Sequence, residues 1–149
     1  MSTTVLHQPV QIRQAATEEA AQQALKLLRK FICSKQLAAI DNAMRGEEQA
    51  YFFQKVVDLA ELITSIPVTY ETDGQGQNAV AYLHYFTAGC DWYITELDVL
   101  VEQHQAFGLA DMGCPEFGYI SIVELLANNG ELDLYWSPKP LRDIARGQL

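Results

Sequence analysis

The first half of the chain carries apolar side chains at the three- and four-residue spacing of amphipathic helices. Thr17 is a suitable N-cap for a first helix, and Glu18 and Glu19 in the first turn suit the positive end of the helix dipole. The pattern therefore predicts a helix from residue 18 to about residue 32. Its apolar positions are Ala20, Ala21, Ala24, Leu25, Leu28, Phe31 and Ile32.

Two further helices are predicted before residue 67. Ser34 can cap a short helix over residues 35–44, and Gly46 offers a left-handed conformation that would end it. A third helix begins at Glu47, and Pro67 stops it. Its wide apolar face consists of Phe52, Phe53, Val56, Val57, Leu59, Ala60, Leu62, Ile63 and Ile66.

After a polar, glycine-bearing segment over residues 72–78, the pattern changes to short runs of β-branched and aromatic residues. These runs predict strands over residues 80–86, 92–96, 105–110, 117–120 and 132–136. Ser121 with Glu124 fits a capping box, so a helix over residues 121–127 is embedded among the strands, and a last turn follows Pro140. Helices followed by hairpin-connected strands predict an α+β fold, with the N-terminal helices packed on an antiparallel β-sheet meander.

Chain length favours a single domain, because 149 residues suffice for one domain of ordinary size and neither half is large enough to bury a sizeable core alone. We predict a flexible N-terminal segment over residues 1–14 and one α+β domain over residues 15–149. This domain comprises a helical half (15–66) and a sheet half (78–137). No apolar run approaches the roughly 18 residues of a membrane span, and the N-terminus lacks the features of a signal peptide. A cytoplasmic protein without membrane contact is expected.

Charge is distributed unevenly along the chain. There are 19 acidic and 10 basic residues, and residues 56–138 contain 13 Asp and Glu residues but no Lys or Arg. Such a sequence lacks the clustered cations that neutralise phosphates, so direct nucleic-acid binding is not expected. An acidic surface instead suits a protein partner with a basic surface. Solvated acids that keep the protein soluble are the alternative explanation of the same stretch.

Five ordered blocks in the second half carry a family resemblance. They are residues 82–86 (YLHYF), 91–96 (DWYITE), 106–108 (AFG), 116–121 (EFGYIS) and 131–135 (ELDLY), with Pro138 and Lys139 beyond. In this order and spacing they resemble the DUF2958 family, a bacterial domain of unknown function, over residues from about 68 to 144. The resemblance implies a bacterial cytoplasmic protein of the kind carried by plasmids and integrated mobile elements, and it assigns no activity.

Residues with metal-binding and nucleophilic side chains lie in the same region. His84 and His104, like Cys90 and Cys114, are too far apart in sequence to form the close ligand pairs that are typical of zinc sites, although the strands could still bring them together. We expect His84 to be a half-buried strand histidine bonded to a neighbour and His104 to be solvated. Three cysteines without a secretory signal indicate free thiols, and the adjacent Asp91 disfavours an activated Cys90 thiolate. No cofactor is expected.

Two hypotheses for the function remain. The leading hypothesis is a non-enzymatic accessory or interaction protein of a bacterial mobile element that binds a basic protein partner through an acidic face of the sheet. Its specific version is a protein that mimics nucleic-acid charge and counters host defence. The alternative is a small enzyme or metal-binding protein that uses His84, Asp91 and Glu96, which must then converge in a pocket. The candidate partner-binding residues are Asp91, Trp92, Tyr93, Glu96, Asp98, Asp111 and Glu116.

Overall fold

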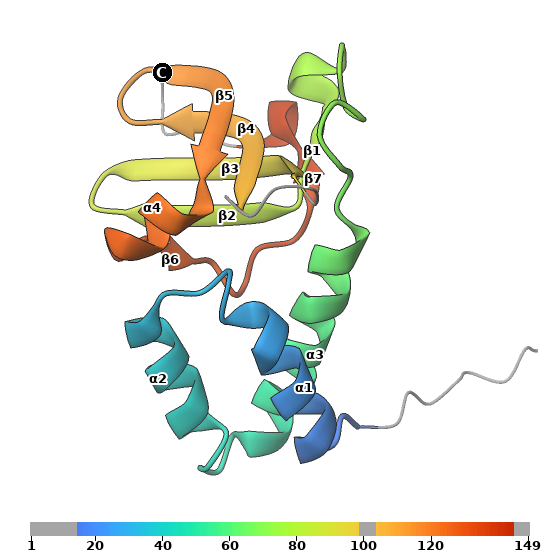
Figure 1. The fold of residues 1–149 in the computed structure, drawn as a ribbon, viewed down its shortest axis with the longest axis vertical. Coiled ribbons are helices and arrows are strands. Elements are labelled where there is room, and N and C mark those ends of the chain that lie inside the picture. Colours follow the sequence, from blue (N-terminus) through green and yellow to red (C-terminus); the bar gives the residue numbers. More distant parts are fainter. Residues whose placement is uncertain (1–14, 99–103, 145–149) are drawn as a thin grey trace, which may run out of the picture.

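The structure is a computed structural model in which residues 15–98 and 104–144 are described, and they form an α+β fold, as predicted (Figure 1). Three helices come first and lie together below the sheet in the figure: α1 (Glu18–Leu28), α2 (Ser34–Ala43) and α3 (Gln49–Ser65). The predicted flexible segment, residues 1–14, lies outside the described residues.

The ends of the helices follow the sequence signals at Thr17 and Pro67 but not at Ser34 or Gly46. Ser34 is the first residue of α2, and Cys33 occupies the N-cap position without a side-chain hydrogen bond, so the prediction of a Ser34 cap is wrong. The Thr17 side chain caps α1 by accepting a hydrogen bond from the backbone N–H of Ala20 (3.1 Å), and α3 ends before Pro67. The prediction of a left-handed Gly46 after α2 is wrong, because Gly46 is not among the glycines with positive φ. Its N–H bonds to the Ala43 carbonyl oxygen (3.2 Å), so the chain continues in right-handed turns towards α3.

The sheet has five antiparallel strands in the order β5-β4-β3-β2-β6. The strands are β2 (Leu83–Thr87), β3 (Cys90–Leu97), β4 (Gln105–Asp111), β5 (Pro115–Ser121) and β6 (Glu131–Leu132). Helix α4 (Ile122–Ala127) joins β5 to β6, and the Ser121 side chain caps it by accepting from the Glu124 N–H (3.2 Å), as the capping box predicts.

Two predicted strands are shorter than their sequence patterns. The run over residues 80–86 divides at Tyr82 into β1 (Val80–Ala81) and β2, because β1 pairs with β7 (Lys139–Pro140) in a separate two-stranded ladder. The run over residues 132–136 contributes only β6 and then turns, with the Trp136 N–H bonded to the Asp133 carbonyl oxygen (3.3 Å). Short 3₁₀ helices complete the described chain at Gly76–Asn78 (η1) and Leu141–Asp143 (η2).

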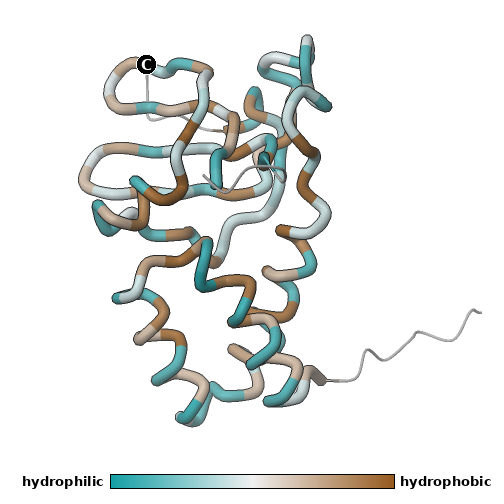
Figure 2. Tube along the Cα trace, in the orientation of Figure 1, coloured by the Kyte–Doolittle hydropathy of each residue, from teal (hydrophilic) through white to brown (hydrophobic). Residues whose placement is uncertain are grey.

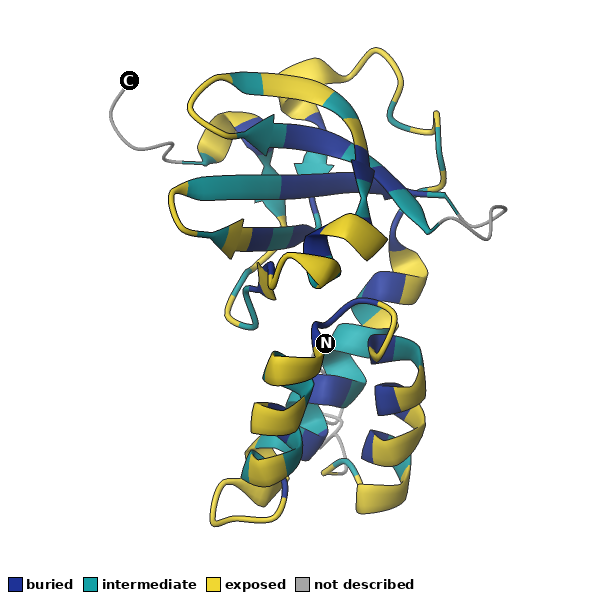
Figure 3. Ribbon diagram, turned by 60° about the vertical axis from the view of Figure 1, so that its left-hand side comes forward, coloured by how far each residue is buried: buried dark blue, intermediate teal, exposed yellow. Residues whose placement is uncertain are grey.

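The face of the sheet that meets the helices, called the inner face here, is apolar and buried. Its side chains pack with those of α1 and α3 in the main hydrophobic core, which shows as buried positions on both halves in Figure 3 and as hydrophobic positions in Figure 2. The Tyr85 hydroxyl donates to the Phe31 carbonyl oxygen (2.6 Å). The inner-face residues of this core are Leu83, Tyr85, Ile94, Leu97, Ala106, Ile120 and Leu132.

The opposite face, called the outer face, is only partly covered. The segment after β6 crosses it and forms a second, smaller core in which Leu141 packs with Tyr93 and Leu109, and Trp136 borders this core. Towards the edge strand β5, the side chains of Phe117 and Tyr119 remain exposed. The outer face is therefore the part of the sheet from which side chains reach solvent.

A β-bulge in β3 changes which side chains lie on the outer face. Ile94 pairs with Gly108, but the next pair along the ladder is Glu96 with Phe107, so β3 has one extra residue. Without this residue, alternation would place Glu96 among the apolar side chains of the inner face. The strands approach so closely here that a Cβ atom on Gly108 would lie 1.9 Å from the Tyr93 carbonyl oxygen. The bulge in β3, together with Gly108 opposite it, thus directs the Glu96 side chain to the outer face.

Candidate functional site

The predicted partner-binding residues are divided between the two faces of the sheet. Trp92 is partly buried and packs against the main core, and Glu116 lies on the same side of the sheet, because both residues pair with Ala110. Asp98 follows β3 and lines a hollow of about 910 Å³ between α1, α3, α4 and the end of β3. Trp92 and Glu116 do not contribute to the outer face.

Three carboxylates form a row across the outer face, which we call the acidic row: Asp91, Asp111 and Glu131. Phe86 pairs with Glu131 on one side and with Asp91 on the other, and Asp91 pairs directly with Asp111. Paired side chains of an antiparallel sheet point to the same face, about 5 Å apart. Like charges in such a position destabilise a sheet unless something neutralises them.

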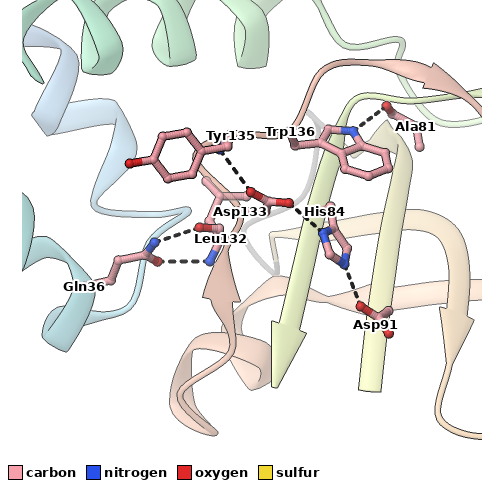
Figure 4. Close-up of polar contacts among 8 residues, drawn as sticks. All are labelled: Gln36, Ala81, His84, Asp91, Leu132, Asp133, Tyr135 and Trp136. Carbon is pink, nitrogen blue, oxygen red and sulfur yellow. Dashed lines mark hydrogen bonds and ion pairs between the residues drawn. The ribbon is translucent and has the colours of Figure 1, made fainter. Parts of the chain in front are cut away.

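His84 lies beside the acidic row and contacts a carboxylate at each ring nitrogen (Figure 4). Its Nε2 lies 2.7 Å from Asp91 Oδ1, and its Nδ1 lies 3.0 Å from Asp133 Oδ2. The two carboxylates lie on opposite sides of the imidazole ring, and both nitrogens can donate at once only in the protonated form. His84 therefore joins β2, β3 and the segment after β6.

The surroundings of His84 are aromatic. Its ring stacks on Tyr93, with centroids 4.9 Å apart and planes at 10°, and it lies 5.1 Å from the ring of Trp136. Trp136 is fixed in turn, because its Nε1 donates to the Ala81 carbonyl oxygen (2.9 Å; Figure 4). The His84 side chain is 13% exposed. The prediction of a half-buried strand histidine bonded to a neighbour is confirmed.

The three residues of the enzyme hypothesis do not converge. His84 and Asp91 are bonded, but the carboxylate of Glu96 accepts hydrogen bonds from Tyr70 and Thr72 instead. Both ring nitrogens of His84 contact carboxylates of the same chain, Asp133 and Asp91, and neither contacts Glu96. Within residues 15–98 and 104–144, no three His, Cys, Asp or Glu side chains are placed to hold one metal ion.

His104 and Cys33 are not part of this site, whereas Cys90 directly precedes Asp91 in β3. The expectation of a solvated His104 is wrong: its ring packs edge-on against Phe31, with centroids 4.4 Å apart, because the end of α1 meets the start of β4. Burial is the main reason why the pKa of His104 lies below its ordinary value. All three cysteines are free, with Cys33 buried and Cys114 exposed.

A second feature of the outer face is a cavity of about 360 Å³ at the end of the sheet away from the acidic row. We call it the Glu96 cavity. Phe107 of β4 and Phe117 and Tyr119 of β5 line it on the sheet side, and residues 69–76 line it on the other. The hydroxyl groups of Tyr119 and Tyr70 lie 3.0 Å apart and join the two sides.

Glu96 is the buried charged group of this cavity, with 3% of its surface exposed. Its Oε1 accepts from the Tyr70 N–H (2.9 Å), and its Oε2 accepts from the N–H (2.8 Å) and the hydroxyl of Thr72. Tyr70 has a φ of 75°, a left-handed conformation that is uncommon for residues other than glycine. Glu96 therefore fixes the loop that walls the cavity.

Sequence reasoning selected Glu96 as an acid on a strand but missed the aromatic residues around it. A signal was present, because Phe117 and Tyr119 are two residues apart and must share a face of β5. Asp133 was missed as a partner of His84, because the two residues are separated by 49 positions in the chain. The direct pairing of Asp91 with Asp111 required the register, which the sequence pattern does not provide.

A family model described as "Protein of unknown function (DUF2958)" matches residues 56–138, which is more than half of the chain. The chain therefore belongs to this family, as the five sequence blocks indicated. The match begins within α3 and ends before β7, so it covers the whole five-stranded sheet. The searches of curated proteins and of solved structures gave no significant match. In the described part of the chain, no helix has the length and apolar character that crossing a membrane requires.

Proposed function

For this member of the DUF2958 family, we propose a non-enzymatic accessory role in which the outer face of the sheet binds a basic segment of another protein. The acidic row is the observation that carries the proposal. It places Glu131 of β6, Asp91 of β3 and Asp111 of β4 in one line across the sheet, within a stretch of sequence that contains no Lys or Arg. A cationic partner would relieve the repulsion between these carboxylates.

The neighbourhood of the row supports binding rather than catalysis. Asp91 is partly exposed, at 39% of its side chain, and contacts His84, whereas Glu131 is exposed. Phe86 lies between Asp91 and Glu131 in the same row and is 37% exposed. An aromatic side chain flanked by acids suits the mixed apolar and cationic character of lysine and arginine side chains.

The biological setting of this role extends the same proposal. The family resemblance implies a protein of bacterial plasmids and integrated mobile elements, and such elements meet host defence proteins that bind nucleic acid through basic surfaces. A protein with the acidic row can occupy such a surface by mimicking phosphate charge. We therefore propose a basic, nucleic-acid-binding host protein as the partner, with direct nucleic-acid binding by this chain excluded from the mechanism.

The test compares two double variants with the same change in net charge. Asp111→Asn with Glu131→Gln removes two charges of the acidic row, and Glu47→Gln with Glu48→Gln removes two exposed charges in the helical half. Binding of a fluorescein-labelled, arginine- and lysine-rich peptide is measured by fluorescence anisotropy. At about 50 mM salt, we expect the row variant to bind about fivefold or more weakly than the wild type and the helical variant within about twofold of it.

At about 500 mM salt, the difference between the two variants should disappear, because exposed charges are then screened. Equal losses in both variants would show that net charge alone attracts the peptide and would contradict the proposal. Affinity capture from bacterial lysate with the same variants then identifies the natural partner. That partner must be retained by the wild type and by the helical variant and be lost with the row variant.

A further inference from the structure

We propose that the Glu96 cavity binds an organic cation, namely an alkylammonium or guanidinium head group. This inference goes beyond the proposed function, because it concerns the other end of the outer face. Phe107 of the cavity and Asp111 of the acidic row are four residues apart on β4, which corresponds to about 14 Å along an extended strand. The two sites can therefore be changed separately.

The walls of the cavity have the aromatic surface that attracts cations. The rings of Phe107 and Phe117 are nearly parallel, at 14° with centroids 6.4 Å apart, and Tyr119 meets Phe107 edge-on at 5.6 Å. The faces of such rings carry the negative part of the quadrupole and bind alkylated ammonium and guanidinium groups. The hydrogen bond to Tyr70 raises the pKa of Tyr119, so its phenol stays neutral at physiological pH.

The charge inside the cavity has the sign that a cation requires. Glu96 is buried at 3% exposure, and Asp73 is the second acid of the lining, whereas none of the described lining residues is Lys or Arg. A buried carboxylate that lacks a cationic partner is costly, even where hydrogen bonds offset part of the desolvation. An organic cation would supply the missing countercharge.

Glu96 also retains capacity to bind a donor. Its Oε2 accepts two hydrogen bonds from Thr72, but its Oε1 accepts one, from the Tyr70 N–H. A carboxylate oxygen can accept two hydrogen bonds, so Oε1 can take one more from a guanidinium or ammonium N–H. The volume of about 360 Å³ falls within the range of small-ligand cavities, about 300–1,000 Å³, and exceeds what a single metal ion would need.

The experiment separates charge from shape. Three ligands are titrated into the full chain, and binding is followed by NMR. Choline carries a trimethylammonium group, and 3,3-dimethyl-1-butanol is its neutral counterpart of the same shape. Agmatine provides a guanidinium group. We expect choline and agmatine to perturb the resonances of residues around Glu96 and to bind about tenfold or more tightly than the neutral alcohol. Equal binding of choline and the alcohol, or no cation binding at about 10 mM ligand, would overturn the proposal.

Matched variants locate the binding. Tyr119→Ala removes an exposed aromatic wall from the edge strand, and Tyr51→Ala removes a similarly exposed tyrosine from α3; their exposures are 58% and 50%. We expect Tyr119→Ala to weaken choline binding about 3- to 30-fold and Tyr51→Ala to leave it unchanged. Glu96→Gln should abolish the preference for choline over the alcohol. Because Glu96 also holds the loop at Tyr70 and Thr72, Tyr119→Ala provides a test that leaves this loop contact in place.

Two further arms identify the source of the cation and separate this inference from the proposed function. Pentapeptides with a central arginine or trimethyllysine are compared with agmatine and choline, and tighter peptide binding indicates a protein side chain as the natural ligand. Equal affinity indicates a free small molecule.

The double variant Asp111→Asn with Glu131→Gln should bind choline as the wild type does. Loss of choline binding in this variant would show that general acidity, not the cavity, attracts the cation.

Discussion

The two faces of one sheet are built from alternate residues of the same strands, yet they differ in nearly every physical property. The inner face presents mainly apolar side chains and the bonded hydroxyl of Tyr85 to the helices, and the charged Glu116 lies exposed on its edge strand β5. The outer face carries the acidic row, the bonded His84 and the buried Glu96. The comparison indicates that stability is concentrated on one face, so the other can keep repelling charges and open aromatic rings.

The largest expected effect comes from truncating one side chain on each face. Ile94→Ala, at a site with 0% exposure on the inner face, should lower the free energy of unfolding by about 2–5 kcal/mol. Phe117→Ala, at 43% exposure on the outer face, should lower it by about 1 kcal/mol or less. Urea denaturation measures both. Similar losses for the two variants would mean that the outer face also stabilises the fold.

An intermediate effect is expected for the polar group of the inner face. Tyr85→Phe leaves the Phe31 carbonyl oxygen without its hydrogen bond and should cost about 1–3 kcal/mol at neutral pH. Burial, with a smaller contribution from Cys33, raises the pKa of the Tyr85 phenol far above its ordinary value. Tyr85 is therefore neutral in the folded protein under conditions in which an unfolded chain would ionise it.

The same residue predicts a dependence on alkaline pH. Because the folded pKa of Tyr85 is raised, its contribution is fully present below about pH 10, where an unfolded tyrosine is neutral. Above that pH, the unfolded state loses a proton that the folded state keeps, so stability falls by about 1.4 kcal/mol per pH unit from this group. Above about pH 10, the stability of Tyr85→Phe should fall less steeply than that of the wild type, by up to that amount. If the variant and the wild type lose stability with pH at the same rate, the ionisation of groups other than Tyr85 causes that loss.

The smallest effect is expected in the acidic row and has the opposite sign. Asp111→Asn removes one of two directly paired carboxylates, while its Oδ1 can still accept from the Gly113 N–H, so stability should rise by about 0.2–1 kcal/mol at low salt. Glu116→Gln is the matched control, because Glu116 pairs with Ala110. An equal gain in the control, or a gain that persists at high salt, would contradict repulsion within the row.

Local signals in the sequence predicted much of the fold. The Thr17 cap, the Pro67 stop and the box formed by Ser121 and Glu124 depend on residues close together in the chain, and each lies where the pattern indicated. The division of the 80–86 run into β1 and β2, the shortness of β6 and the strand β7 could not be predicted, because a periodic pattern needs more positions than two-residue strands contain. Their partners are set by pairing between distant segments.

The candidate site was less predictable than the fold for the same reason. Alternation along β3 places Glu96 on the wrong face unless the bulge is known, and the bulge depends on the close approach at Gly108. The contact of His84 with Asp133 depends on the turn after β6. The uneven charge did point to the sheet half, but the row itself is a consequence of strand register.

The paired hydrogen bonds between the Gln36 side chain and the backbone of Leu132 have a consequence for how the protein is made. Gln36 Nε2 donates to the Leu132 carbonyl oxygen (2.7 Å), and its Oε1 accepts from the Leu132 N–H (2.9 Å), across 96 residues of chain. During synthesis, the helices emerge long before β6, and the contacts that join them to the sheet are of high contact order. The apolar surface that these helices present to the sheet therefore stays uncovered until the sheet is made, a stage at which chaperones would be expected to act.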